Sequence, residues 1–145
     1  MDMNLIVQIP ALNEEKTIAA VIGAIPAIPG VDKVQVVVID DGSTDRTSEL
    51  ARQAGAHVIR HERRMGVGAA FRSGVAFATE QGADIIVTID ADGQFDPADI
   101  PRVIGPILQG EADFVTASRF IDPALAPEMP WAKRWGNDFM ARWIS

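Results

Sequence analysis

The sequence predicts an α/β fold, in which a mostly parallel, doubly wound sheet carries helices on both faces. Three observations predict it. Several apolar runs are continuous and β-branched, as in strands that are buried on both faces. Segments with helical spacing separate these runs, and three runs end in clusters of polar and acidic residues. Because ligands of open α/β sheets bind beyond the carboxyl ends of the strands, these clusters also locate a candidate site.

Five runs are expected to be strands, because they are apolar and β-branched without polar alternation. They are NLIVQIP (4–10), VQVVVID (34–40), AHVIR (56–60), DIIVTID (84–90) and DFVTASR (113–119). We expect the polar clusters that follow the first, second and fourth runs to meet at one edge of the sheet.

Helical patterns lie between the strands, at 14–25, 44–54 and 66–81. The first has Ile and Val at helical spacing, and the second begins with Ser, Thr and Asp, which favour helix N-termini. The third is rich in Ala and is expected to place Phe71, Val75 and Ala78 on one side.

Length and composition limit the classes of function. The chain has 145 residues, 48% of them hydrophobic and 23% charged, as in one globular domain. A net charge of -7 argues against nucleic-acid binding, which requires a basic face. The absence of cysteine excludes disulfides and zinc–thiolate sites, and no apolar run approaches the ~20 residues of a membrane span.

The three acidic clusters occupy residues 10–15, 40–45 and 90–96. Each could be a turn or a helix cap, but three of them at converging strand ends indicate a binding site. In the third cluster, Asp90, Asp92 and Gln94 are spaced two apart and could direct oxygen atoms at one divalent cation. Magnesium and manganese accept such ligands and keep positions for water and substrate phosphates. The cluster therefore predicts a site for a metal-bound nucleoside diphosphate.

A calcium-binding helix–loop–helix is an alternative for the third cluster, but it fits poorly. Aligning Asp90, Asp92 and Gly93 with such a loop puts Thr88 and Asp99 where the loop requires Asp and Glu. A β-branched run also precedes the loop where a helix is required.

A phosphoacceptor signalling domain is a second alternative. It would use Asp40 and Asp41 as the acidic pair and Asp90 as the phosphorylated residue. Such domains have a lysine after a late strand, whereas this chain has Arg119 there, and the cluster at 10–15 would have no role.

Five motifs together carry a resemblance to a known family. IPALNEE, VIDDGSTDRT, GVGAAFRSG, DADGQFDP and ASRF occur in the order and approximate spacing seen in glycosyltransferase family 2. The chain resembles the N-terminal, nucleotide-binding part of such enzymes, which have the GT-A fold, and is most similar to the dolichyl-phosphate mannose synthase and polyprenyl-phosphate glycosyltransferase group. The resemblance implies a nucleotide-sugar-binding domain at 1–121. It also implies that the Pro-rich loop and aromatic helix at 122–145 begin an acceptor region that continues beyond this chain.

The resemblance also implies roles for single residues. Those expected to line the base and ribose pocket are Pro10, Ala11, Asn13, Glu14, Asp40 and Asp41. Asp90 and Asp92 match the metal-binding DxD motif of the family, and Gln94 can join them to hold Mg²⁺ or Mn²⁺. Arg119 matches an arginine near the donor diphosphate, and Arg72 lies at a Gly-rich helix start that favours anions. One departure is Arg64, where the family often has Asn.

The chemistry implied is an inverting sugar transfer from a GDP- or UDP-linked donor, with Asp90, Asp92 and Arg119 as the catalytic set. A phosphate acceptor needs no general base, whereas a hydroxyl acceptor does. His57 and His61 flank a middle strand and are expected to have surface or structural roles, which suits a polyprenyl phosphate acceptor. The alternatives are a saccharide or other hydroxyl acceptor, and a donor-binding fragment without turnover.

The last segment has an aromatic stripe. Trp131, Trp135, Phe139 and Trp143 are four apart, and Lys133, Arg134 and Arg142 lie on other helical faces. Such a helix suits a membrane interface with anionic lipids, or packing on a C-terminal part outside this chain. We therefore expect a peripheral protein at the cytoplasmic face of a membrane, and self-association through this helix would be a further consequence.

Overall fold

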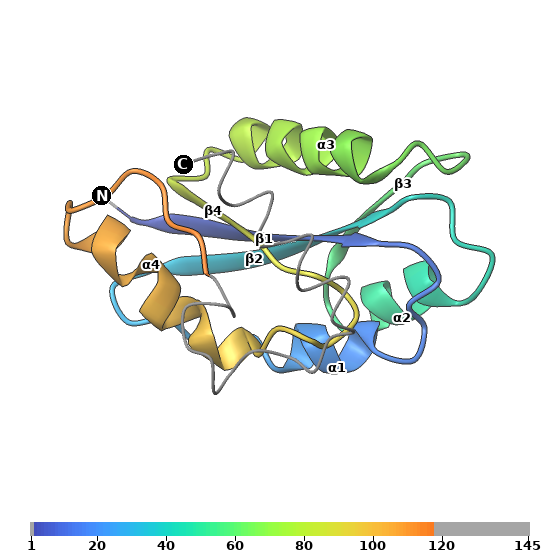
Figure 1. Ribbon diagram of the computed structural model, residues 1–145, viewed down its shortest axis with the longest axis horizontal. Helices are drawn as coiled ribbons and strands as arrows, with labels where there is room; N and C mark the ends of the chain where they lie inside the picture. The colour runs from blue at the N-terminus through green and yellow to red at the C-terminus, as the bar shows by residue number, and fades with distance from the viewer. Residues whose placement is uncertain (1, 118–145) are drawn as a thin grey trace, which may run out of the picture. The chain divides into compact units, whose positions relative to one another are not determined.

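A four-stranded parallel sheet forms the centre of the part of the chain that the computed structural model describes, residues 2–117 (Figure 1). Its strands are β1 (Asn4–Ala11), β2 (Lys33–Asp40), β3 (His57–Arg60) and β4 (Ile85–Thr88). Their order across the sheet is β3-β2-β1-β4. This arrangement confirms the predicted parallel α/β sheet and four of the five expected strands.

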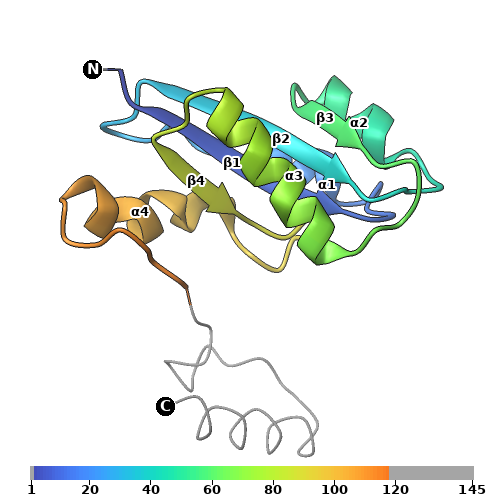
Figure 2. The same cartoon turned by 90° about the horizontal axis from the view of Figure 1, so that it is seen from above.

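Helices cover both faces of the sheet. They are α1 (Ile18–Gly23), α2 (Thr47–Gln53), α3 (Val67–Glu80) and α4 (Ile100–Leu108), with a short 3-10 turn η1 (Pro97–Asp99) before α4. Figures 1 and 2 show α3 on one face, while α1, α2 and α4 lie on the other. Helix α4 was not among the predicted elements, because Pro101, Gly105 and Pro106 interrupt its helical pattern.

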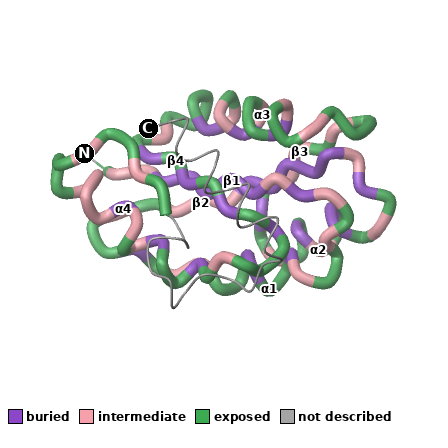
Figure 3. The backbone as a smooth tube through the Cα atoms, viewed as in Figure 1, coloured by how far each residue is buried: buried purple, intermediate pink, exposed green. Residues whose placement is uncertain are grey.

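The buried core follows the alternation of side chains along β1 and β2 (Figure 3). Leu5, Val7 and Ile9 contribute to a large cluster with α1, α2 and α4, whereas Ile6 belongs to a smaller cluster beneath α3. Since both faces are covered, β1 is apolar at nearly every position, as its sequence predicts. Each fully buried Val, Leu or Ile stabilises the fold by about 1.5–3 kcal/mol.

Parallel pairing places the carboxyl ends of the strands at one edge of the sheet. Ala11 is paired with Asp40, and Asp40 with Arg60, while Gln8 of β1 is paired with Thr88 at the end of β4. The segments that follow β1, β2 and β4 therefore begin beside one another. These are the three segments that carry the acidic clusters.

The side of α3 that carries Phe71, Val75 and Ala78 is only partly its buried side. The buried residues of α3 are Ala70, Gly74 and Ala78, while Val75 is half-buried and Phe71 is 47% exposed. The reason is the close approach of α3 to β1, since a Cβ on Gly74 would lie 1.9 Å from Oε1 of Gln8. Small side chains therefore face the sheet, and large ones are displaced from it.

The expected strand at 113–119 is absent from the residues that are described. Phe114–Ala117 form no strand, and the sheet of the described residues ends at β4. The last two residues of that run, Ser118 and Arg119, lie outside the described residues.

The chain divides into two compact units, Met1–Asp113 and Phe114–Ser145. The predicted boundary after residue 121, the Pro-rich loop and the aromatic helix lie outside the described residues. Within the described residues, no helix is both long enough and apolar enough to cross a bilayer.

Candidate functional site

The loops that follow β1 and β2 are joined by hydrogen bonds. Asn13 has a left-handed backbone (φ 56°), and its N–H donates to Oγ of Ser43 at 2.9 Å. In return, Oδ1 of Asn13 accepts the N–H of Thr44 at 2.8 Å. The two loops therefore hold each other at the edge where β1 and β2 end.

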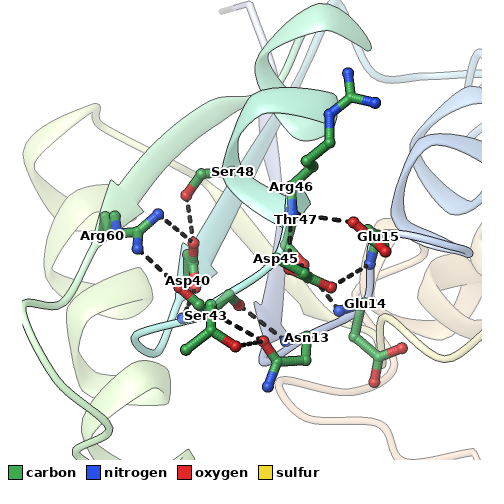
Figure 4. A network of polar contacts seen from close by, with 11 residues as sticks. Asn13, Glu14, Glu15, Asp40, Ser43, Asp45, Arg46, Thr47, Ser48 and Arg60 are labelled. Atoms are coloured by element: carbon green, nitrogen blue, oxygen red, sulfur yellow. Dashed lines mark hydrogen bonds and ion pairs between the residues drawn. The ribbon is translucent and has the colours of Figure 1, made fainter.

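A second set of contacts extends this junction toward α2 (Figure 4). The N–H of Glu14 donates to Oγ1 of Thr47 at 2.8 Å, and that of Glu15 donates to Oδ2 of Asp45 at 3.1 Å. Burial raises the pKa of Asp45, but hydrogen bonds from Thr47 and Glu15 outweigh it and hold the pKa below its usual value. The segment after β1 thus serves as a partner for the start of α2.

Asp40, the last residue of β2, is fully buried. Its carboxylate accepts hydrogen bonds from the N–H of Ser43, at 2.8 Å, and from the hydroxyl of Ser48, and it pairs with Nη1 of Arg60 at 3.5 Å. Burial raises the pKa of Asp40, but these hydrogen bonds and the Arg60 charge outweigh it and lower the pKa. Asp40 therefore joins the loop after β2 to α2 and β3.

Asp41 is also buried, and it faces a different segment. Its Oδ1 accepts the N–H of Met65 and contacts Nδ1 of His61, at 2.8 and 2.7 Å, and its Oδ2 accepts the N–H of Gly66 at 2.8 Å. Burial raises the pKa of Asp41, but His61 and these two backbone donors outweigh it and lower the pKa. Asp41 thus fixes the turn before α3.

The segment after β4 presents its acids differently. Ile89 and Ala91 are buried, whereas Asp90 and Asp92 between and beyond them are exposed. The carbonyl of Ala91 accepts the hydroxyl of Thr17 at 2.7 Å, and Oδ1 of Asp92 accepts the N–H of Gln94 at 2.9 Å. The backbone is therefore fastened to the segment before α1, while the two carboxylates remain at the surface.

The exposed carboxylates of Asp90 and Asp92 suit a divalent cation whose other coordination positions are filled by a bound ligand and water. Among residues 2–117, no three His, Asp or Glu side chains lie close enough together to enclose a metal ion. Two exposed carboxylates on one turn match the one or two protein ligands that Mg²⁺ or Mn²⁺ takes when substrate phosphates and water complete its coordination. Asp90 and Asp92 are the residues that would hold it, and Gln94, which is exposed beside them, could add an amide oxygen.

The other predicted site residues are distributed as follows. Pro10 and Ala11 end β1, where Ala11 is paired with Asp40, and Asn13 and Glu14 lie in the loop beyond it. Arg72 is exposed on α3, with Nη1 3.8 Å from the position that a Cβ on Gly68 would take. Arg119 lies outside the described residues.

Sequence reasoning did not single out the hydroxyl groups that hold these loops. Ser43, Thr47 and Ser48 all bind carboxylates or loop N–H groups, and Thr17 binds the turn after β4. The run DGSTDRTS carries a usable signal, because Ser, Thr and Asp favour turns and helix N-termini through hydrogen bonds of this kind.

Comparisons with known proteins show the family of this chain. The profile of the family described as "Glycosyl transferase family 2" matches residues 6–144. A UDP-N-acetylglucosamine–dolichyl-phosphate N-acetylglucosaminyltransferase of Methanococcus voltae is 36% identical over 89% of this chain and 57% of its own length. An undecaprenyl-phosphate mannosyltransferase of Micrococcus luteus is 30% identical over 97% of this chain and 59% of its own length. The chain thus spans about half the length of these curated relatives.

A solved structure is similar in three dimensions. Glucosyl-3-phosphoglycerate synthase of Mycobacterium tuberculosis, in complex with Mn²⁺, uridine diphosphate and glucosyl-3-phosphoglycerate, superposes with a TM-score of 0.63 and 39% identity. The match covers 75% of this chain and 41% of that one.

Proposed function

Because this chain belongs to glycosyl transferase family 2, we propose that it binds a GDP- or UDP-linked sugar at the carboxyl ends of β1, β2 and β4 for an inverting transfer to a polyprenyl phosphate. The observation that carries the proposal is the turn after β4. It presents the exposed carboxylates of Asp90 and Asp92 beside loops whose own carboxylates are already occupied.

Each part of the site has a proposed task. Asp90 and Asp92, with Gln94, hold Mg²⁺ or Mn²⁺, which when bound neutralises charge on the leaving diphosphate. Pro10, Ala11, Asn13 and Glu14 line the nucleoside side. Asp40 and Asp41 hold the loops that carry these residues, since both are buried and accept hydrogen bonds from protein donors. Arg72 and Arg119 attract the anionic donor.

The choice of acceptor rests on the relatives and on the histidines. Two relatives are named for transfer to dolichyl or undecaprenyl phosphate, acceptors that are already anionic. A hydroxyl acceptor would require a general base. His61 is occupied by Asp41 and Ser73, and His57 stacks on Phe77 with ring centroids 4.6 Å apart. The two histidines of the chain thus have structural contacts, which favours a phosphate acceptor.

A hydroxyl acceptor is the second candidate. The solved neighbour is a glucosyl-3-phosphoglycerate synthase that was also crystallised with UDP-glucose and phosphoglyceric acid, and it is 39% identical to this chain. Incubating a labelled nucleotide sugar separately with polyprenyl phosphate and with 3-phosphoglycerate, and identifying the product, distinguishes the two candidates.

Donor binding is tested by titrating GDP and UDP into the protein in a calorimeter, with Mn²⁺ and with EDTA. One of the two nucleotides should bind at least about tenfold more tightly with Mn²⁺, because the cation links its diphosphate to two carboxylates. Equal affinity with and without the metal would remove the basis of the proposal.

We also propose a membrane-peripheral location at the cytoplasmic face, through the aromatic segment 131–143. Replacing Trp135 and Trp143 by Ser should weaken binding to vesicles that contain anionic lipid, and should reduce any self-association, while leaving nucleotide affinity unchanged. Sedimentation with vesicles and size-exclusion chromatography measure the two effects. Unchanged vesicle binding in this variant would contradict the assignment.

A further inference from the structure

His61 bridges the strand end to helix α3. It lies directly after β3, and its side chain is only 9% exposed. Its Nδ1 lies 2.7 Å from Oδ1 of Asp41, and its Nε2 lies 2.9 Å from Oγ of Ser73 on α3. The three side chains form a continuous chain of hydrogen bonds from β2 to α3.

The chemistry of the groups fixes the direction of the bond between His61 and Asp41. The lowered pKa of Asp41 means that its carboxylate is ionised and can only accept, so Nδ1 of His61 must carry the proton. Nε2 of the neutral ring then accepts the hydroxyl of Ser73. A protonated ring would instead donate from Nε2 to the same oxygen, so both contacts persist in either state.

The same carboxylate holds the turn before α3. Asp41 accepts the N–H groups of Met65 and Gly66, and Gly66, with φ 96°, is the residue from which α3 begins. This turn also packs closely on the loop after β2. A Cβ on Gly42 would lie 2.8 Å from backbone atoms of Arg63 and Arg64. The turn at Arg63–Gly66 therefore lies beside the loop after β2, and Asp41 binds two of its backbone N–H groups.

We propose that His61 is a positioning residue for the donor site. By holding Asp41 in the rotamer that binds Met65 and Gly66, it keeps the Arg63–Gly66 turn as a preformed wall beside the loop after β2. The effect on the donor rests on the proposed function, whereas the effect on the turn does not. A nucleophilic role for Ser73 does not fit, because Ser73 lies inside α3, where backbone N–H groups are bonded within the helix and cannot stabilise an oxyanion.

Two substitutions of His61 separate its contacts. His61→Asn keeps a donor near the position of Nδ1, and His61→Gln can reach toward Ser73 but not Asp41. If His61 positions Asp41, amide hydrogen exchange of Met65 and Gly66 should accelerate about tenfold in His61→Gln, as expected for loss of one charge-assisted hydrogen bond. It should accelerate much less in His61→Asn. Ser73→Ala should have an intermediate effect, and His57→Asn, at the other end of β3, is the matched control.

The donor is followed in the same variants. Whichever of GDP and UDP binds the wild type should bind His61→Gln several-fold more weakly, while the ratio of affinities with Mn²⁺ and with EDTA stays unchanged. Wild-type exchange at Met65 and Gly66 in His61→Gln, or acceleration spread evenly over the β-sheet, would overturn the positioning role. If neither nucleotide binds the wild type, the proposed function fails, and the exchange measurement still decides the role of His61 in the turn.

Discussion

Two acidic pairs stand at the carboxyl ends of strands in the same sheet, and they are built in opposite ways. Asp40 and Asp41, at the end of β2 and directly after it, are buried and bonded to donors from α2, β3 and the turn before α3. Asp90 and Asp92, after β4, are exposed. Burial of a carboxylate is costly unless protein donors replace water. The first pair therefore has a structural role, in which each carboxylate binds and fixes neighbouring loops. The second pair retains the solvent-facing oxygens that a cation could bind.

The comparison teaches that an acidic motif at a strand end is not by itself a ligand site. The carboxylates after β2 hold together the segments that shape the rim. Those after β4 are carried on a backbone that is fixed through Ala91 and Thr17, and their side chains are exposed. Removing an acid of the first pair should therefore lower stability, whereas removing one of the second pair should lower metal-dependent nucleotide affinity.

The largest effect is expected for Asp40→Ala. This change removes the carboxylate that accepts from the N–H of Ser43 and the hydroxyl of Ser48 and that pairs with Nη1 of Arg60, and should lower the free energy of unfolding by about 2–4 kcal/mol. Asp90→Ala, as the control, should change it by less than about 0.5 kcal/mol. Urea denaturation followed by circular dichroism measures both. Similar losses of unfolding free energy in the two variants would contradict a structural role that is specific to the buried pair.

The next effect concerns the metal. Asp92→Asn should abolish most of the gain in nucleotide affinity that Mn²⁺ provides, a loss of about tenfold or more, because a neutral amide is a weaker ligand for a hard cation. The melting temperature without nucleotide should stay near that of the wild type. Calorimetric titration and thermal unfolding check the two statements. A metal-dependent gain that survives in Asp92→Asn would place the cation elsewhere.

A smaller effect follows from acidity. The pKa values of Asp40, Asp41 and Asp45 are lowered in the folded state, so the unfolded state binds more protons as the pH falls. The stability that these groups contribute is therefore present above about pH 4 and is lost as the pH falls through their folded pKa values. The urea midpoint should decline below pH 4, and the decline should be shallower in Asp41→Asn. An equally steep decline in that variant would assign the acid sensitivity to other groups.

The smallest effect is expected for a residue that holds the turn with the exposed pair, Asp90 and Asp92. Thr17→Val removes the hydroxyl that binds the carbonyl of Ala91, and should cost about 0.5–1.5 kcal/mol of stability. Because this bond fixes the turn that carries Asp90 and Asp92, the affinity gain from Mn²⁺ should also fall several-fold. Thr79→Val, which removes a hydroxyl bonded within α3, is the matched control and should leave that gain unchanged.

The sequence determined the strands β1 to β4, helices α1 to α3 and the meeting of their polar ends. These features depend on local patterns, such as continuous β-branched runs and helical spacing, that require no knowledge of the rest of the chain. Prediction was wrong where a partner mattered. Helix α3 packs on β1 through small residues such as Gly74 and leaves Phe71 exposed, because the two elements approach each other closely at Gly74. Phe114–Ala117, expected to belong to a fifth strand, form none.

Only the tertiary structure decided which acids are occupied. In the sequence, Asp41 and Asp92 are alike, since each is an acid in the segment that follows an apolar, β-branched run. The residues that distinguish them are distant along the chain. His61 lies 20 positions from Asp41, and Gly66 lies 25 positions from it, whereas the bond that Asp92 accepts comes from Gln94, two positions away. Such partners meet an acid only when strands and helices pack, because the pKa and exposure of a carboxylate depend on the groups around it in space.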